Sequence, residues 1–299
     1  MRNVLCAALV EQAVRPGLVF LTGDLGYNAL EPLRAALGER FVNAGVAEQN
    51  MVSVAAGLSA SGLNAWAYSI APFIYGRPFE QIRNDVCLHD LPVKLVGNGG
   101  GYAYGVMGST HHALEDYGVL LCLRGMSAFV PAFAADVPAI VQRLFAHPGP
   151  AYLRLGRDEK QKNLKPPPYA PWRRLLSGAG ATLLVVGPLG GPLWEAAAAL
   201  EKERRPNLWM LTELPVSAGS IPPEFLEDLA RSRRLVVAEE HVAQGGVGQA
   251  IAHALALMGK LPKAFAHRHA LGYVTGRYGS QLFHRQECAL DPAGVLAAL

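Results

Sequence analysis

One acidic side chain, Glu48, stands at the start of a run of small and apolar residues that predicts a helix. The run includes Val52, Ala55, Ala56 and Leu58. A carboxylate beside an apolar surface is costly unless it has a partner, but the helix dipole stabilises a glutamate in the first turn. Two interpretations therefore stay open, a glutamate that stabilises the helix end and a buried acid that holds or transfers a proton.

Aromatic, histidine and arginine side chains elsewhere suit ligand binding. Phe73 and Tyr75 could stack on a flat ring, or could simply be buried in the core. His111 and His112 follow a glycine-rich segment, and histidine can donate to substrate oxygens or carry a proton near neutral pH. The guanidinium of Arg157 can form two parallel hydrogen bonds, although exposed arginine is the norm and Arg157 could be an ordinary surface residue.

The elements that must position these residues alternate along the chain. Short apolar or β-branched runs predict strands over residues 18–21, 41–43, 65–68, 93–96, 128–130, 152–154, 182–186, 208–211 and 235–238. Helical patterns are found between them over residues 4–14, 48–61, 78–88, 135–145, 193–204 and 248–258. Such alternation is typical of a mostly parallel sheet with helices on both faces.

A segment rich in lysine and proline interrupts this pattern and predicts an extended linker. We therefore expect an α/β protein of two domains, each a mostly parallel sheet flanked by helices. The expected boundaries are residues 1–160 for the first domain, 161–175 for the linker and 176–299 for the second domain. The second domain contains Glu239-Glu240-His241 and a glycine-rich helix start at 245–248, which we interpret as packing and interface residues.

Composition excludes several classes of protein. A formal charge of +3 with no basic run gives no support for nucleic-acid binding. The four cysteines lie far apart and suit reduced thiols in a cytoplasmic protein better than a disulfide framework. Glycines and prolines divide the most apolar window, residues 181–200, into a strand and a helix, so we expect no membrane span.

The order of motifs resembles the pyrimidine-binding domain of transketolases followed by their C-terminal domain. The resemblance covers essentially the whole chain and depends on the segments Thr22-Gly23-Asp24-Leu25-Gly26, Gly45-Val46-Ala47-Glu48-Gln49-Asn50-Met51, Pro72-Phe73 and Gly108-Ser109-Thr110-His111. It implies that Glu48 acts on thiamine diphosphate. In that family a glutamate hydrogen-bonds the pyrimidine ring of the cofactor and favours the tautomer that takes up the reactive proton. In this role Glu48 must itself share or hold a proton.

The same resemblance implies roles for the other candidates. Phe73, or else Tyr75, would stack on the pyrimidine ring, and Asp24 matches an Asp-Leu pair of that domain and joins the expected cofactor-binding residues. His111 would line the substrate channel beside His112. Arg157 would hold the phosphate of the acceptor.

The chain departs from the family pattern just before His111. Transketolases usually have Gly-Glu-Asp-Gly there, and this chain has Gly105-Val106-Met107-Gly108. An acid that would contact hydroxyls of the donor is replaced, so Met107 becomes a candidate determinant of an altered substrate preference.

The resemblance also indicates what another chain must supply. The family holds the diphosphate through Mg²⁺ on a Gly-Asp-Gly motif, which this sequence lacks, and no cluster of oxygen ligands suits Mg²⁺. The chain thus resembles the C-terminal subunit of a split transketolase. We expect an α2β2 heterotetramer in which a partner chain holds Mg²⁺ and the diphosphate. We expect this assembly to move a two-carbon ketol unit from a ketose, expected to be a phosphate, to an aldehyde. The alternatives are the β chain of a 2-oxo acid decarboxylase and a non-catalytic interaction subunit.

Overall fold

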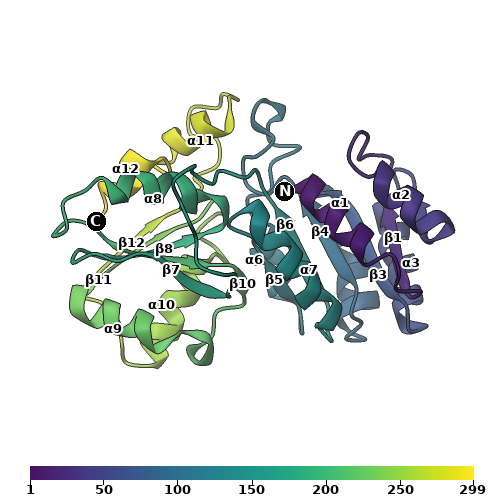
Figure 1. Ribbon diagram of the computed structural model, residues 1–299, viewed down its shortest axis with the longest axis horizontal. Coiled ribbons are helices and arrows are strands. Elements are labelled where there is room, and N and C mark those ends of the chain that lie inside the picture. Colours follow the sequence, from purple (N-terminus) through teal and green to yellow (C-terminus); the bar gives the residue numbers. More distant parts are fainter.

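Apolar strands form two separate sheets in the computed structural model, which describes residues 1–299 (Figure 1). The first sheet has seven strands in the order β10-β5-β6-β4-β3-β1-β2, and the second has five in the order β12-β11-β8-β9-β7. Every residue of β1, β6, β8 and β9 is buried, and these strands are mostly apolar, since a parallel strand covered on both faces has no solvent side.

The first sheet is parallel except at one edge. Its parallel strands are β1 (Leu18–Thr22), β2 (Phe41–Asn43), β3 (Asn64–Ile70), β4 (Lys94–Asn98), β5 (Ser127–Phe129) and β6 (Ala151–Leu155). Strand β10 (Glu213–Leu214) comes from the second half of the chain and pairs antiparallel with β5. The two halves are therefore joined by backbone hydrogen bonds as well as by side chains.

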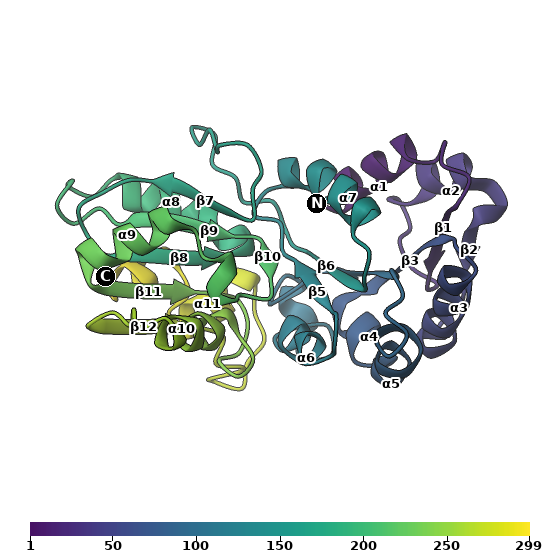
Figure 2. The same cartoon turned by 90° about the horizontal axis from the view of Figure 1, so that it is seen from below.

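Helices cover both faces of the first sheet (Figure 2). One face packs against α1 (Arg2–Glu11), α2 (Glu31–Leu37) and α7 (Val137–Ala146). The other packs against α3 (Glu48–Ala60), α4 (Ala71–Tyr75), α5 (Phe79–Gln81), the π-helix Ile82–Cys87 and α6 (Asp116–Leu121). This second face places the start of α3 and the residues after α4 on the same side of the sheet.

The second sheet has a similar layered arrangement. It consists of β7 (Trp172–Leu176), β8 (Thr182–Val186), β9 (Asn207–Leu211), β11 (Arg234–Ala238) and β12 (Ala264–Arg268), with only β7 antiparallel. Helices α8 (Gly190–Ala198), α11 (Gln281–Glu287) and α12 (Pro292–Leu296) lie on one side, and α9 (Pro223–Ser232) and α10 (Val247–Leu257) on the other (Figure 1).

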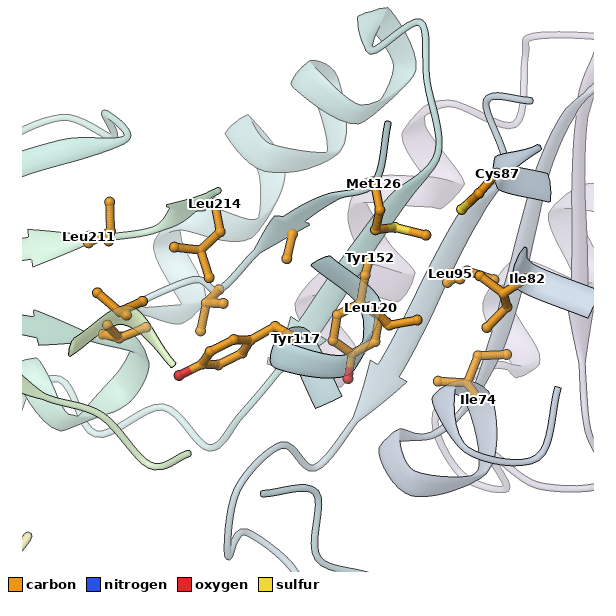
Figure 3. Close-up of a cluster of buried hydrophobic side chains, with 14 of the residues drawn as sticks. Ile74, Ile82, Cys87, Leu95, Tyr117, Leu120, Met126, Tyr152, Leu211 and Leu214 are labelled. Carbon is orange, nitrogen blue, oxygen red and sulfur yellow. The ribbon is translucent and has the colours of Figure 1, made fainter. Parts of the chain in front are cut away.

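The two layered units share one apolar core. Figure 3 shows this cluster running from Ile74 and Ile82 beside the first sheet, past Tyr117 of α6, to Leu211 and Leu214. Burying such a continuous apolar surface fixes the units against each other by the hydrophobic effect. The active-site candidates of the first unit are therefore supported from the second.

The predicted fold class, α/β with two mostly parallel sheets flanked by helices, is confirmed. One segment differs from expectation, because residues 172–175, expected in the linker, belong to strand β7. Their charged pair Arg173-Arg174 obscured the strand pattern, although β7 lies at a sheet edge where such residues are tolerated. No helix is long and apolar enough to cross a membrane.

Candidate active site

The candidate residues follow the carboxyl ends of neighbouring parallel strands. These strands lie in the order β2-β1-β3-β4-β6, and they lead respectively to Glu48, Asp24, Phe73, His111 and Arg157. Ligands of α/β proteins bind beyond the carboxyl ends of the strands, where loops of different strands converge. The fold thus gathers at one edge residues that are distant in sequence.

Glu48 is the first residue of α3, and only 5% of it is exposed. The N–H groups of the helix start favour a negative charge there. The carboxylate also has a partner that sequence reasoning missed, because Nη1 of Arg77 donates to its Oε1 at 2.6 Å. Both side chains line a pocket of about 690 Å³ in front of the α3 N-terminus.

Phe73 lies close to this ion pair. The guanidinium carbon of Arg77 is 3.9 Å from the centroid of the Phe73 ring, which places the cation over the ring face. The Phe73 ring in turn meets the His111 ring edge-on at 5.4 Å, and Tyr104 lies 5.7 Å beyond His111. Glu48, Arg77, Phe73, His111 and Tyr104 are therefore in contact as one continuous group.

His111 and His112 have different surroundings. His111 is partly exposed, and its Nδ1 is hydrogen-bonded to the Thr110 hydroxyl at 2.9 Å. His112 is buried, its Nε2 donating to the Gly105 carbonyl and its Nδ1 accepting from the Tyr273 hydroxyl. Burial lowers the pKa of His112, and both ring nitrogens have partners. The geometry thus favours His111 for substrate contact and His112 for holding the loop.

Tyr75 has different contacts from Phe73. Its hydroxyl donates to Glu115 at 3.1 Å, and burial raises its pKa. Its ring also packs against the core cluster on this face of the sheet. Of the two aromatic candidates for stacking, Phe73 is therefore the one that lies beside Glu48's partner.

Asp24 lines a different pocket, of about 220 Å³, with Tyr27 and Phe41 among its walls. Its carboxylate accepts from Asn43 at 3.2 Å, and the Asn43 side chain also accepts from the N–H of Gly45 at 2.9 Å. Asp24 is thus connected to the loop that leads to Glu48 rather than to Glu48 itself.

Two further candidates lie on the surface. Arg157 is exposed two residues after β6 and forms no ion pair or side-chain hydrogen bond in the chain. Met107 is 53% exposed at the end of the short turn Gly105–Met107. Both are therefore accessible to a bound molecule.

The loop that bears His111 is held by the second sheet, a connection that sequence reasoning did not predict. Glu240 accepts from the N–H of Tyr102 and from the side chains of Gln281 and Arg285. The neighbouring Glu239 accepts from the first N–H groups of α10, and so occupies the helix start that could otherwise bind an anion. These contacts accord with a packing role for the Glu239-Glu240-His241 segment.

The site suits an organic cation or a heteroaromatic ring better than a metal. No group of three or more histidine, cysteine, aspartate or glutamate side chains is arranged to hold a metal ion. A buried carboxylate beside an aromatic face can instead hydrogen-bond the edge of a flat nitrogenous ring and stack on its face. In this structure the guanidinium of Arg77 makes both contacts, a hydrogen bond to the Glu48 carboxylate and stacking over the Phe73 ring.

The chain is similar in sequence to transketolases and to related enzymes. Residues 6–162 match the family model described as "Transketolase, pyrimidine binding domain". The chain is 30% identical over 232 residues to a subunit of the apulose-4-phosphate transketolase of Actinobacillus succinogenes, covering 76% of this chain and 73% of that protein. It is also 32% identical over 269 residues to 1-deoxy-D-xylulose-5-phosphate synthase 2 of Geobacter sulfurreducens, covering 86% of this chain but 41% of that protein.

Among solved structures, the chain is similar to one described as "Split gene transketolase, inactive beta4 tetramer". The two are 32% identical with a TM-score of 0.82, and the match covers 99% of this chain and 95% of the other. Sequence and structure therefore agree along nearly the full length.

Proposed function

The chain belongs to the transketolase family of thiamine diphosphate-dependent enzymes, and we propose that it is one subunit of a two-chain enzyme that transfers a two-carbon ketol unit from a phosphorylated ketose to an aldehyde. The observation that carries this proposal is the placement of buried Glu48 beside Phe73 and His111 at one edge of the sheet. A non-catalytic subunit would have no need to keep an acid buried there.

Glu48 and Phe73 have the chemistry to hold the pyrimidine ring of thiamine diphosphate. The carboxyl group of Glu48 would hydrogen-bond a ring nitrogen and share a proton with it, while Phe73 would pack on the ring face. When bound, the cofactor supplies a nucleophilic carbon that can carry the transferred unit. The residues of this chain supply orientation and the proton at Glu48.

His111 and Arg157 would contact the substrate. His111 follows β4 and touches Phe73, so a group bound against Phe73 would lie within reach of its ring. Its free ring nitrogen can donate to or accept from a substrate oxygen. Arg157 follows the neighbouring strand β6, and its unpaired guanidinium suits a phosphate on the acceptor.

A partner chain completes this proposed site. The sequence contains no Gly-Asp-Gly segment, and the similar Actinobacillus protein is named as one subunit of its transketolase. We place Mg²⁺ and the diphosphate on the partner, in an α2β2 assembly. The similar split-gene protein is described as inactive in a beta4 tetramer, which accords with dependence on a second kind of subunit. The four free cysteines suit a cytoplasmic enzyme.

Met107 favours a second candidate, a reaction that starts from a 2-oxo acid. Where transketolases usually have an acid, this chain presents a half-exposed thioether, whose sulfur is only a weak hydrogen-bond acceptor. A 2-oxo acid lacks the hydroxyl groups that such an acid would bind. Ketose phosphates and 2-oxo acids are therefore the two classes of donor to compare.

The test is a donor and acceptor screen on the complex reconstituted with the partner chain, cofactor and Mg²⁺. Ketose phosphates, unphosphorylated ketoses and 2-oxo acids serve as donors, and aldehydes with and without phosphate as acceptors. Arg157→Ala should raise KM for phosphorylated acceptors about tenfold or more and leave the others little changed, because one charge-assisted contact is lost. Arg124→Ala, on an exposed loop before β5, is the matched control. Equal effects on both acceptor classes would contradict the phosphate contact.

A further inference from the structure

Arg77 occupies both contacts that the proposed cofactor ring needs. Its guanidinium donates to Glu48 at 2.6 Å and covers the Phe73 ring with its carbon 3.9 Å from the centroid. We propose that Arg77 is an internal ligand of this half-site, defined as Glu48 and Phe73, and that cofactor binding requires Arg77 to leave. The proposal rests on the proposed function of the same two residues.

Shape and charge explain why a guanidinium can take this place. It is flat, it carries N–H donors along its edge, and it stacks on aromatic faces. A pyrimidine ring bonded to Glu48 through its edge and packed on Phe73 would use the same carboxylate and the same ring face. Two flat groups cannot stack on the same face of Phe73, so Arg77 in this position and a cofactor ring on that face exclude each other.

The internal ligand also explains how Glu48 stays buried when no cofactor is bound. An ionised carboxylate with 5% exposure needs a charged or hydrogen-bonding partner. Arg77 is the only side chain that contacts the Glu48 carboxylate through a hydrogen bond or ion pair. It therefore satisfies the acid until another donor replaces it.

Arg77 is placed so that it can leave. The Arg77 side chain is 44% exposed, and it lies in the short connection between α4 and α5, directly after Gly76. Because the Arg77 guanidinium is half-exposed, water competes for its charge and weakens its hold on Glu48. The guanidinium can move into solvent without disturbing α3, which holds Glu48, or α4, which holds Phe73.

The test measures cofactor binding, not turnover. Calorimetry gives the Kd of thiamine diphosphate with Mg²⁺ for the reconstituted complex containing wild type, Arg77→Ala or Arg77→Met. Both variants remove the competing guanidinium, and we expect the Kd to fall about five- to tenfold, the effect of losing a half-exposed ion pair and its cation–π contact. Arg83→Ala changes an exposed arginine on the nearby π-helix Ile82–Cys87 and should leave the Kd unchanged.

Guanidinium ions provide a second readout. In the Arg77→Ala complex, low millimolar guanidinium chloride should refill the vacated place and weaken cofactor binding, while sodium chloride at the same concentration should not. Wild type should respond equally to both salts. Arg77→Met keeps an unbranched side chain but removes the charge and the N–H donors, so it tests the idea even if the alanine variant is unstable.

The outcomes separate the two proposals. If wild type binds the cofactor and neither Arg77 variant binds it more tightly, Arg77 is not a competing ligand, and weaker binding would make it a cofactor contact instead. If no complex binds the cofactor at all, the proposed function fails and the internal ligand with it.

Discussion

Glu48 combines burial, a helix N-terminus and a single charged partner, and these features define its expected behaviour on substitution. Glu48→Gln keeps the size and a hydrogen-bonding edge but cannot hold or share the proton. We expect turnover by the reconstituted complex to fall several hundred-fold or more, within the range of about 10²–10⁴ for lost proton transfer. Steady-state kinetics measure this, with Glu80→Gln on the exposed surface of α5 as the control. Near-normal turnover would remove Glu48 from the reaction.

We expect Met107 to affect which donors the enzyme accepts. A donor hydroxyl that loses its water on binding and gains no acceptor costs about 1–3 kcal/mol, so the wild-type complex should discriminate poorly between donors that differ only at that hydroxyl. Met107→Asp introduces an acceptor, and kcat/KM for ordinary ketose phosphates should then rise. Donors epimeric at one carbon are compared in both proteins. A wild type that already prefers one epimer strongly, with no gain in the variant, would show that other residues contact the hydroxyl.

The sequence indicated Glu48 and its aromatic and histidine neighbours, but it did not indicate Arg77, the ion-pair partner of Glu48. Glu48 and the neighbouring Phe73 and His111 could be inferred because short motifs mark them, and the structure places Phe73 and His111 in contact. Arg77 could not, because nothing local signals an ion pair between residues 29 positions apart. The separate surroundings of His111 and His112 were also hidden, since Tyr273, which bonds His112, lies far along the chain.

At the scale of the elements, Lys94 is an unusual feature of strand β4. It is fully buried, and its ammonium donates only to the carbonyls of His147 and Gly149, at 2.8 and 2.9 Å. Burial lowers its pKa from 10.5 to about 7. The folded chain therefore holds this proton less tightly than the unfolded chain.

This difference predicts a pH dependence of stability. Between pH about 7 and 10.5 the unfolded state binds more protons, so the free energy of unfolding should rise with pH, by roughly 1 kcal/mol per pH unit from this group. Urea titrations at several pH values measure it. Lys94→Met should lose that part of the slope, whereas Lys162→Met on the exposed linker should keep it. An unchanged slope in Lys94→Met would contradict the depressed pKa.

The strands of both sheet interiors were predictable, as was the edge strand β2, whereas the edge strands β7, β10 and β12 were not. β1, β8 and β9 are continuous apolar runs because both of their faces are covered. Edge strand β12 ends in His267 and Arg268 and has no fully buried residue, so it lacks that signal. β10 has two residues and exists only because it pairs with β5, which no local pattern can indicate.

At the scale of the whole molecule, the second unit supports the site of the first. Glu240 and Arg285 hold the loop that bears His111, and Arg154 of β6 pairs with buried Asp116 while donating to the Glu240 carbonyl. The shared apolar core of Figure 3 and the pairing of β10 with β5 fix the two units together. The loop that bears His111 is thus positioned by residues far from it in sequence, although it contains one of the motifs on which the resemblance to transketolases depends.

We propose that this chain holds one half of a thiamine diphosphate site and needs a partner for the other half. Calorimetric titration of thiamine diphosphate and Mg²⁺ into the chain alone, and into the chain mixed with a partner that carries a Gly-Asp-Gly domain, tests it most directly. We expect no measurable binding to the chain alone, because Arg77 fills the half-site and no group of side chains is arranged to hold a metal ion, and saturable binding to the mixture. Tight binding by the chain alone, or none by the mixture, would contradict it.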